Sequence, residues 1–216
     1  MPARRAPAAY PLAMAGVVLA SNVLVQFRLG DWLTWGALTY PLAFLVTDLA
    51  NRLHGPAAAR RVVLWGLMAG LAASAVGTQI HGAFGPLVTP RVALASGLAF
   101  LAAQTLDVAL FDRLRAGAWW RAPLASTLAG SMLDTALFFA IAFSAALALP
   151  PSWGDVAWAN EAVPLLGAGP AAPLWASLAL ADWSVKLALA LLALAPFRRL
   201  TRGAPTPMRP PLGQGH

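Results

Sequence analysis

The chain has 216 residues, of which 59% are hydrophobic and only 11% charged, with a net charge of +7 and no cysteine. Soluble domains carry roughly a quarter charged residues, so this composition excludes an ordinary soluble globule. A chain without cysteine has no disulfide framework and no thiolate metal site. Its histidines (His54, His81 and His216) are expected in loops or in the tail, so we predict no metal site.

Apolar runs of about 20 residues, the length that a helix needs to cross a hydrocarbon core of roughly 30 Å, follow one another along the chain. They lie at about 8–27, 32–50, 62–82, 92–111, 123–149 and 174–197. The sequence therefore predicts an all-α fold, a polytopic membrane protein built as a bundle of six transmembrane helices. Residues 1–202 form this single domain, and residues 203–216, with little apolar surface, are predicted to be a disordered cytoplasmic tail.

The first run follows Arg4 and Arg5, as the core of a signal peptide would. It is too long for a signal peptide and contains Asn22 and Gln26, so we expect an uncleaved first span.

The second span contains the string GALTYPLAFLVTDLAN, which places a proline and an aspartate among apolar residues. Pro41 removes an amide hydrogen bond and disturbs a turn. Two interpretations stay open: a simple kink, which membrane helices tolerate, and a broken helix at a transporter's binding site. The neighbouring Trp35 and Tyr40 favour the wall of a site. Asp48 is open between an ion pair with Arg52, four residues on, and a role in binding.

The last three spans carry polar residues at helical spacing: Gln104 and Asp107; Thr127, Ser131 and Asp134; and Asp182 and Lys186. Residues three or four apart share one face of a helix. Each ionisable group at membrane depth costs at least about 2.5–3.5 kcal/mol, so these faces should meet in a polar cavity. Lys186 is able to neutralise Asp182 within its own span. Asp134 and Asp107 have no basic partner in theirs and are the sharper binding candidates.

Arginines alternate between the joints. They precede the first span, lie between spans two and three and between spans four and five, and follow the last span, whereas the opposite joints hold only Arg28 and Arg91. By the positive-inside rule both termini are predicted to be cytoplasmic. The basic charge then reports membrane topology, and we expect no nucleic-acid binding.

Four strings resemble the queuosine precursor transporters, also called the vitamin uptake transporter family: TWGALTYPLAFLVTDLANRLHGPAAARR, RVALASGLAFLAAQTLDVALFDRLR, WWRAPLASTLAGSMLDTALFFAIAF and ADWSVKLALALLALAPF. They stand in the family order between positions 34 and 197. The resemblance implies a six-span inner-membrane importer of 7-cyano-7-deazaguanine and 7-aminomethyl-7-deazaguanine, which are salvaged for queuosine in tRNA.

The substrate implied by this resemblance suits the embedded polar groups. A carboxylate, for which Asp134 or Asp107 is the first choice, accepts hydrogen bonds from the N1–H and amine edge of a deazaguanine, as acidic residues do at base edges elsewhere. The flat ring needs a stacking partner. The predicted substrate-binding set is Asp134, Asp107, Gln104, Asn22, Trp35, Tyr40, Asp48, Asp182, Lys186 and Trp183, with Gln104, Asn22 or Lys186 as the donor to the base carbonyl.

Other functions remain as alternatives. A substrate-binding membrane subunit of a multi-component ATP-driven vitamin importer would have a similar size and would need an energising partner. An intramembrane enzyme is disfavoured, because no histidine is embedded beside a serine, and no catalytic residue is predicted. The predicted partners are a small deazapurine and the lipid bilayer, without a cofactor. Self-association into a homo-oligomer and the energy coupling stay open.

Overall fold

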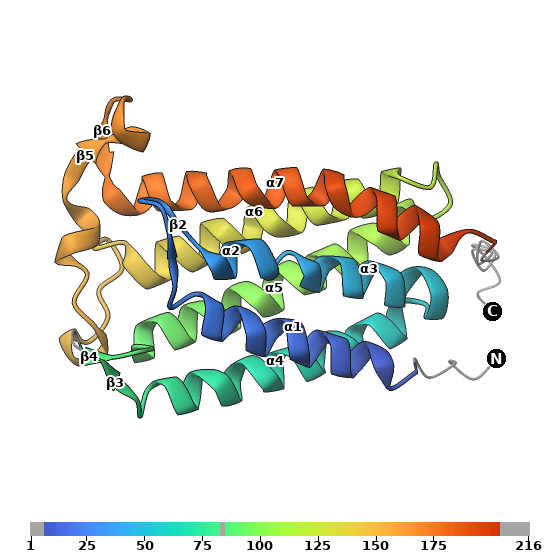
Figure 1. Ribbon diagram of the computed structural model, residues 1–216, viewed down its shortest axis with the longest axis horizontal. Helices are drawn as coiled ribbons and strands as arrows, with labels where there is room; N and C mark the ends of the chain where they lie inside the picture. The colour runs from blue at the N-terminus through green and yellow to red at the C-terminus, as the bar shows by residue number, and fades with distance from the viewer. Residues whose placement is uncertain (1–6, 83–84, 204–216) are drawn as a thin grey trace, which may run out of the picture.

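The computed structural model describes residues 7–82 and 85–203, which form a bundle of helices along one long axis (Figure 1). The helices are α1 (Ala9–Leu24), α2 (Trp35–Thr39), α3 (Leu42–His54), α4 (Pro56–Gly77), α5 (Pro90–Leu114), α6 (Arg121–Phe143) and α7 (Leu174–Thr201). Three antiparallel hairpins pair β1 (Arg28–Leu29) with β2 (Leu33–Thr34), β3 (His81–Gly82) with β4 (Gly85–Pro86), and β5 (Ala162–Pro164) with β6 (Ala171–Pro173). Short 3-10 turns occur at Pro151–Trp153, Ala157–Asn160 and Leu165–Gly167. The prediction of a mostly helical bundle is confirmed.

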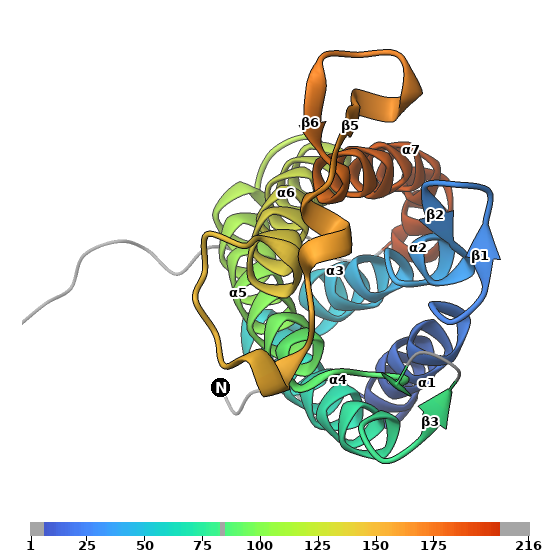
Figure 2. The ribbon, with the colours of Figure 1, turned by 90° about the vertical axis from the view of Figure 1, so that its left-hand side faces the viewer.

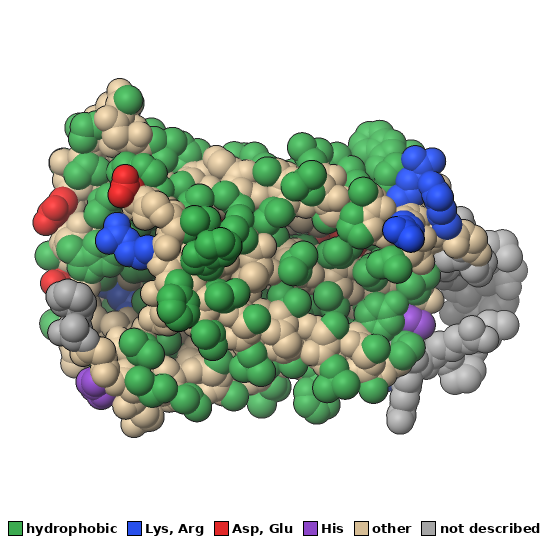
Figure 3. Space-filling model, in the orientation of Figure 1, with side chains coloured by type: hydrophobic (Ala, Val, Ile, Leu, Met, Phe, Trp, Pro, Cys, Tyr) green, Lys and Arg blue, Asp and Glu red, His purple; other side chains and the backbone are tan. Residues whose placement is uncertain are grey.

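The two ends of the bundle differ in charge. The hairpins lie at one end, which we call the hairpin end, and the described chain begins and finishes at the other, the arginine end (Figure 1). The helix termini and joints at the arginine end carry Arg52, Arg60, Arg61, Arg113, Arg115, Arg121, Arg198, Arg199 and Arg202. At the hairpin end the described arginines are Arg28 and Arg91. On the face in Figure 3 the charged side chains gather at the two ends and leave a hydrophobic middle.

Four of the described helices, α4, α5, α6 and α7, are long and apolar enough to cross a membrane. The apolar α1 has 16 residues, and α2 and α3 are shorter. Large hydrophobic side chains are exposed on the outside of the bundle, among them Trp65 at 60% and Leu192 at 68%. Lipid accommodates such side chains, so the chain is a multi-pass membrane protein.

The helices differ from the predicted spans at two joints. α4 begins at Pro56 rather than near residue 62, since proline suits the first position of a helix and the preceding Gly55 has a φ of +87°. Arg60 and Arg61 therefore lie within α4 rather than in a joint. α6 ends at Phe143 rather than near residue 149, because the backbone of the next residue is extended.

The second predicted span is divided at Tyr40 and Pro41 into α2 and α3. Both residues keep right-handed helical dihedrals, and the amides of Ala43 and Phe44 bond carbonyls three residues back, at 3.0 and 3.1 Å. Pro41 has no amide hydrogen, so the α-helical bonding pattern is interrupted there. The result is a tightened turn in a nearly continuous helix, with Tyr40 at the interruption.

The hydrophobic core consists of two clusters at different positions along the bundle. Met14, Val62 and Phe100 belong to a buried cluster between α1, α4 and α5. Phe111 and Phe197, with ring centroids 6.1 Å apart, form a second cluster nearer the arginine end. These clusters fill the middle and the arginine end, and an apolar cavity lies towards the hairpin end.

Candidate functional site

A cavity of about 450 Å³ lies between the hairpin-end halves of the helices. Figure 2 shows the helices of the bundle from this end. Its wall combines small residues of α4 (Gly66, Gly70 and Ser74) with residues of α1, α2, α5, α6 and α7. Small side chains on α4 leave room that larger ones would fill. The volume falls within the range of pockets that bind small molecules.

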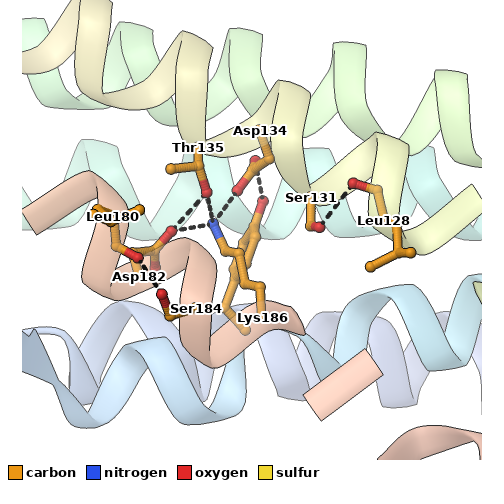
Figure 4. Close-up of polar contacts among 9 residues, drawn as sticks. Leu128, Ser131, Asp134, Thr135, Leu180, Asp182, Ser184 and Lys186 are labelled. Atoms are coloured by element: carbon orange, nitrogen blue, oxygen red, sulfur yellow. Dashed lines mark hydrogen bonds and ion pairs between the residues drawn. The ribbon is translucent and has the colours of Figure 1, made fainter. Parts of the chain in front are cut away.

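The polar floor of the cavity is an ion-pair cluster around Lys186 of α7 (Figure 4). Its Nζ lies 2.6 Å from Asp182 Oδ2 and 2.7 Å from Asp134 Oδ2 of α6. It also donates to Thr135 Oγ1 at 2.9 Å, and that hydroxyl donates to Asp182 Oδ2 at 2.8 Å. Tyr40 donates to Asp134 Oδ1 at 3.1 Å. The cluster thus joins α2, α6 and α7 at the interruption beside Pro41.

The cluster leaves one carboxylate face available to a ligand. The Lys186 side chain is 5% exposed and that of Asp134 6%, whereas that of Asp182 is 17% exposed. Within the described part of the chain no hydrogen bond reaches Asp182 Oδ1. The cluster contains two carboxyl groups and one ammonium group.

The predicted ion pair between Asp182 and Lys186, four residues apart, is confirmed. Asp134 also belongs to this ion-pair cluster, although the sequence offers it no basic partner within its own span. Lys186 of α7 reaches Asp134 on the neighbouring α6, and its Nζ lies at nearly equal distances from the Asp134 and Asp182 carboxylates.

Of the other predicted site residues, Asn22 and Tyr40 line the cavity. Trp35 is 47% exposed and Trp183 half-buried, and neither belongs to the lining. Gln104, Asp107 and Asp48 also lie outside the lining, buried in a separate layer between α3, α5 and α6. Binding of substrate by these residues stays a prediction.

The ion pair considered for Asp48 and Arg52 is replaced by other contacts. The Asp48 carboxylate accepts hydrogen bonds from Ser126 at 3.3 Å and Thr127 at 3.2 Å. Arg52 Nη1 donates to the carbonyl of Arg115 at 3.0 Å, and Arg115 Nη2 donates to the carbonyl of Asn51 at 3.0 Å. The two arginines thereby link the C-terminal ends of α3 and α5.

Aromatic residues that the sequence interpretation missed line the cavity: Trp32, Phe138, Phe139, Phe143 and Trp158. The Phe143 and Trp158 ring centroids lie 5.6 Å apart at 70°. A signal was present, since Phe138 follows Asp134 by four residues and so shares its helix face. Trp158 comes from the loop before α7, and only the folded chain brings it to α6.

A sequence model of the family described as "Putative vitamin uptake transporter" matches residues 34–200. The queuosine precursor transporter of Escherichia coli (strain K12) is 41% identical over 141 residues, which are 59% of this chain and 64% of that protein. Probable queuosine precursor transporters of Haemophilus influenzae and Bacillus subtilis are 39% and 35% identical, over 51% of this chain and 52% and 56% of their own lengths. The chain thus matches between half and two thirds of the length of these curated relatives. No solved structure matches it.

The matched region contains the Tyr40 interruption and the whole Asp134–Lys186–Asp182 cluster, in the order in which the resembling strings place them. A match over more than half of the chain establishes the relationship, and the chain belongs to the vitamin uptake transporter family, that of the queuosine precursor transporters.

Proposed function

We propose that this protein imports the queuosine precursors 7-cyano-7-deazaguanine and 7-aminomethyl-7-deazaguanine across the bacterial inner membrane, for salvage into tRNA. The observation that carries the proposal is the cavity of about 450 Å³ with an ion-pair cluster as its floor and aromatic rings in its wall. A planar, polar base needs both features: hydrogen-bonding groups at its edge and an apolar surface for its faces.

The base edge fits the available face of the floor. Asp182 Oδ1 accepts from the N1–H and the exocyclic amine of a deazaguanine, as a carboxylate does at base edges elsewhere. Lys186 already directs its three N–H groups at Asp134, Asp182 and Thr135, so it has none left for the base carbonyl. Asn22 of the cavity wall supplies that donor in our proposal.

The charge of the floor suits the aminomethyl substrate. A site with two carboxyl groups and one ammonium group attracts a cationic amine, and the low dielectric of a buried cavity strengthens that attraction. The aromatic wall stabilises either substrate by stacking, which accepts any flat ring. Among the rings, Tyr40 donates to Asp134 and has its centroid 5.5 Å from Lys186 Nζ, and Phe138 follows Asp134 by about one helical turn.

We also propose six membrane spans with both termini in the cytoplasm, the interrupted α2–α3 pair being one span. A reporter fused after residue 202 is expected to be active only on the cytoplasmic side, because the arginine end obeys the positive-inside rule. A matching reporter placed in the loop at residue 155, at the hairpin end, should show the opposite activity. Periplasmic activity of the first fusion would reverse the proposed orientation.

Purified protein in liposomes tests transport itself. We expect uptake of labelled 7-cyano-7-deazaguanine by the protein alone, with no added partner. Uptake that requires an ATP-hydrolysing complex would favour the substrate-binding subunit of an ATP-driven importer, and absence of uptake in both settings would reject transport of this base.

Asp182→Asn is expected to weaken binding of the base by about ten- to a hundredfold. The change keeps the size of the side chain but turns an acceptor oxygen into a donor, and a hydrogen bond to a charged group contributes roughly 1.5–3 kcal/mol. The fold should persist, because Lys186 keeps its partner Asp134. Isothermal titration measures the affinity, and the exposed Asp31→Asn at the hairpin end is the control. Equal affinities in the two variants would remove Asp182 from the site.

A further inference from the structure

A second buried acidic site lies between the cavity and the arginine end. Asp48 of α3 and Asp107 of α5 are 3% and 0% exposed, and neither lines the cavity. On α6 their neighbour Thr127 precedes Asp134 by seven residues, a distance of roughly 10 Å along a helix. This pair is therefore separate from the floor of the cavity.

The two carboxyl groups have unequal surroundings. Each oxygen of Asp48 accepts a hydrogen bond from a hydroxyl group, Oδ1 from Ser126 and Oδ2 from Thr127. Neither oxygen of Asp107 has a hydrogen-bond donor among the described residues, although both are fully buried. The α3–α5 hydrogen bonds of Thr47 with Gln104 and of Asn51 with the Val108 carbonyl flank both carboxyl groups. A Cβ added at Gly130, one helical turn after Ser126, would lie 3.4 Å from the Asp107 Cβ, so both carboxyl groups face the same stretch of α6.

Among the described residues, no basic group forms an ion pair with these two carboxyl groups. Lys186 is held by Asp134 and Asp182, Arg115 by Asp112 and a carbonyl of α3, and Arg52 by a carbonyl of α5. In the layer around Asp107, α3 contributes Asp48, while α6 contributes Ser126 and the backbone at Gly130. Two ionised carboxylates buried side by side, without a cation, would carry a large uncompensated cost in free energy.

A single proton bound by the pair removes the repulsion between the two carboxylates. Two carboxylates offer only acceptors to each other, whereas a protonated Asp107 donates its O–H to the Asp48 carboxylate. Asp48 then accepts three hydrogen bonds and bears the one remaining charge. A pair of carboxyl groups that holds one proton thus explains why no other group donates a hydrogen bond to Asp107.

We propose that Asp48 and Asp107 form a proton-binding site that couples proton entry to substrate import; the coupling, though not the proton binding, rests on the proposed function. The site occupies a tight helix contact: a Cβ added at Gly130 would lie 2.9 Å from Phe44 of α3 and 3.2 Å from the Ala103 carbonyl of α5. Loss of the proton would set two negative charges against each other in this contact and would push α3 away from α5. Because α3 continues from Tyr40, which binds Asp134, the same movement reaches the cavity.

Liposomes with the membrane potential clamped at zero and a gradient of one pH unit test the coupling. Neutral 7-cyano-7-deazaguanine is the probe, since its own charge does not change. Wild type is expected to accumulate it up to about tenfold, the limit for one proton per substrate at this gradient. Asp107→Asn should equilibrate it without accumulation. The control Asp112→Asn, on the same helix but with a 43% exposed side chain, should accumulate it like wild type.

Infrared difference spectroscopy tests the proton binding without transport. Wild type and Asp112→Asn should show the C=O band of a protonated carboxyl group, which Asp107→Asn should lack. Persistence of that band in Asp107→Asn, accumulation by Asp107→Asn, or accumulation driven by a sodium gradient and not by a pH gradient would each overturn the proposal. Uptake by wild type that ignores the pH gradient would also overturn the coupling and leave the proposed import standing, whereas no uptake at all would count against import only.

Discussion

Lys186→Met is expected to abolish uptake and to destabilise the protein by about 3–5 kcal/mol. The substitution leaves two carboxylates, Asp134 and Asp182, in a buried site with no cation between them. Removing one partner of a buried ion pair typically costs this much, because a charge remains without compensation. In a domain of this size the corresponding fall in Tm is roughly 6–20 °C. Thermal unfolding of the purified protein in detergent measures the loss of stability.

The carboxylates of the same cluster offer matched controls for this prediction. Asp134→Asn leaves the Lys186–Asp182 pair intact, so we expect a smaller loss of stability than for Lys186→Met. A triple variant, with asparagine at both aspartates and methionine at Lys186, contains no orphaned charge and should regain much of the Tm without regaining uptake. A Lys186→Met protein with the wild-type Tm would mean that the ammonium does not neutralise these carboxylates.

Arg91→Met is expected to destabilise the hairpin end by about 4.5 kcal/mol or more, because it removes three hydrogen bonds to a charged donor, each contributing about 1.5–3 kcal/mol. Arg91 is only 4% exposed, and its guanidinium group donates to the carbonyls of Ile141, Ser144 and Leu147. These carbonyls lie at and beyond the C-terminal end of α6, where a helix leaves its last carbonyls unsatisfied and where positive charge is favourable.

The same variant should weaken substrate binding, because the end of α6 carries Phe138, Phe139 and Phe143 into the cavity wall. Arg91→Lys keeps the charge but not the planar fork of donors, so its effect should be intermediate. The exposed Arg28→Met at the same end controls for the loss of a positive charge. A Tm shift no larger than that of the control would show that other groups satisfy these carbonyls.

Arg91 also illustrates a limit of charge counting. In the sequence it is an exception to the arginine alternation, a basic residue in a joint of the opposite side. In the structure it is a buried helix cap whose three acceptors lie 50 to 56 residues further along the chain. The positive-inside rule concerns charges in the loops beside the membrane. The Arg91 charge is buried and bound to carbonyl groups, so it does not count against the predicted orientation.

What the sequence determined by itself is local. Hydrophobic length predicted the apolar helices, and a spacing of four residues predicted the Asp182–Lys186 ion pair, because both depend only on the geometry of one helix. Pro41 marked the interruption of α2–α3 for the same reason, since a missing amide acts within a single turn.

Tertiary structure alone decided which buried carboxylates lie together. Asp134 and Asp107 are alike in the sequence, each being a lone acid in an apolar run. In the structure Asp134 binds Lys186 in the cavity, whereas Asp107 lies in the separate buried layer that also holds Asp48. Helix periodicity specifies the angle between two residues of one helix but not the rotation of that helix about its axis. That rotation is set by packing against neighbouring helices, here by contacts such as Gly130 against Phe44, and it determines which neighbour each carboxylate faces.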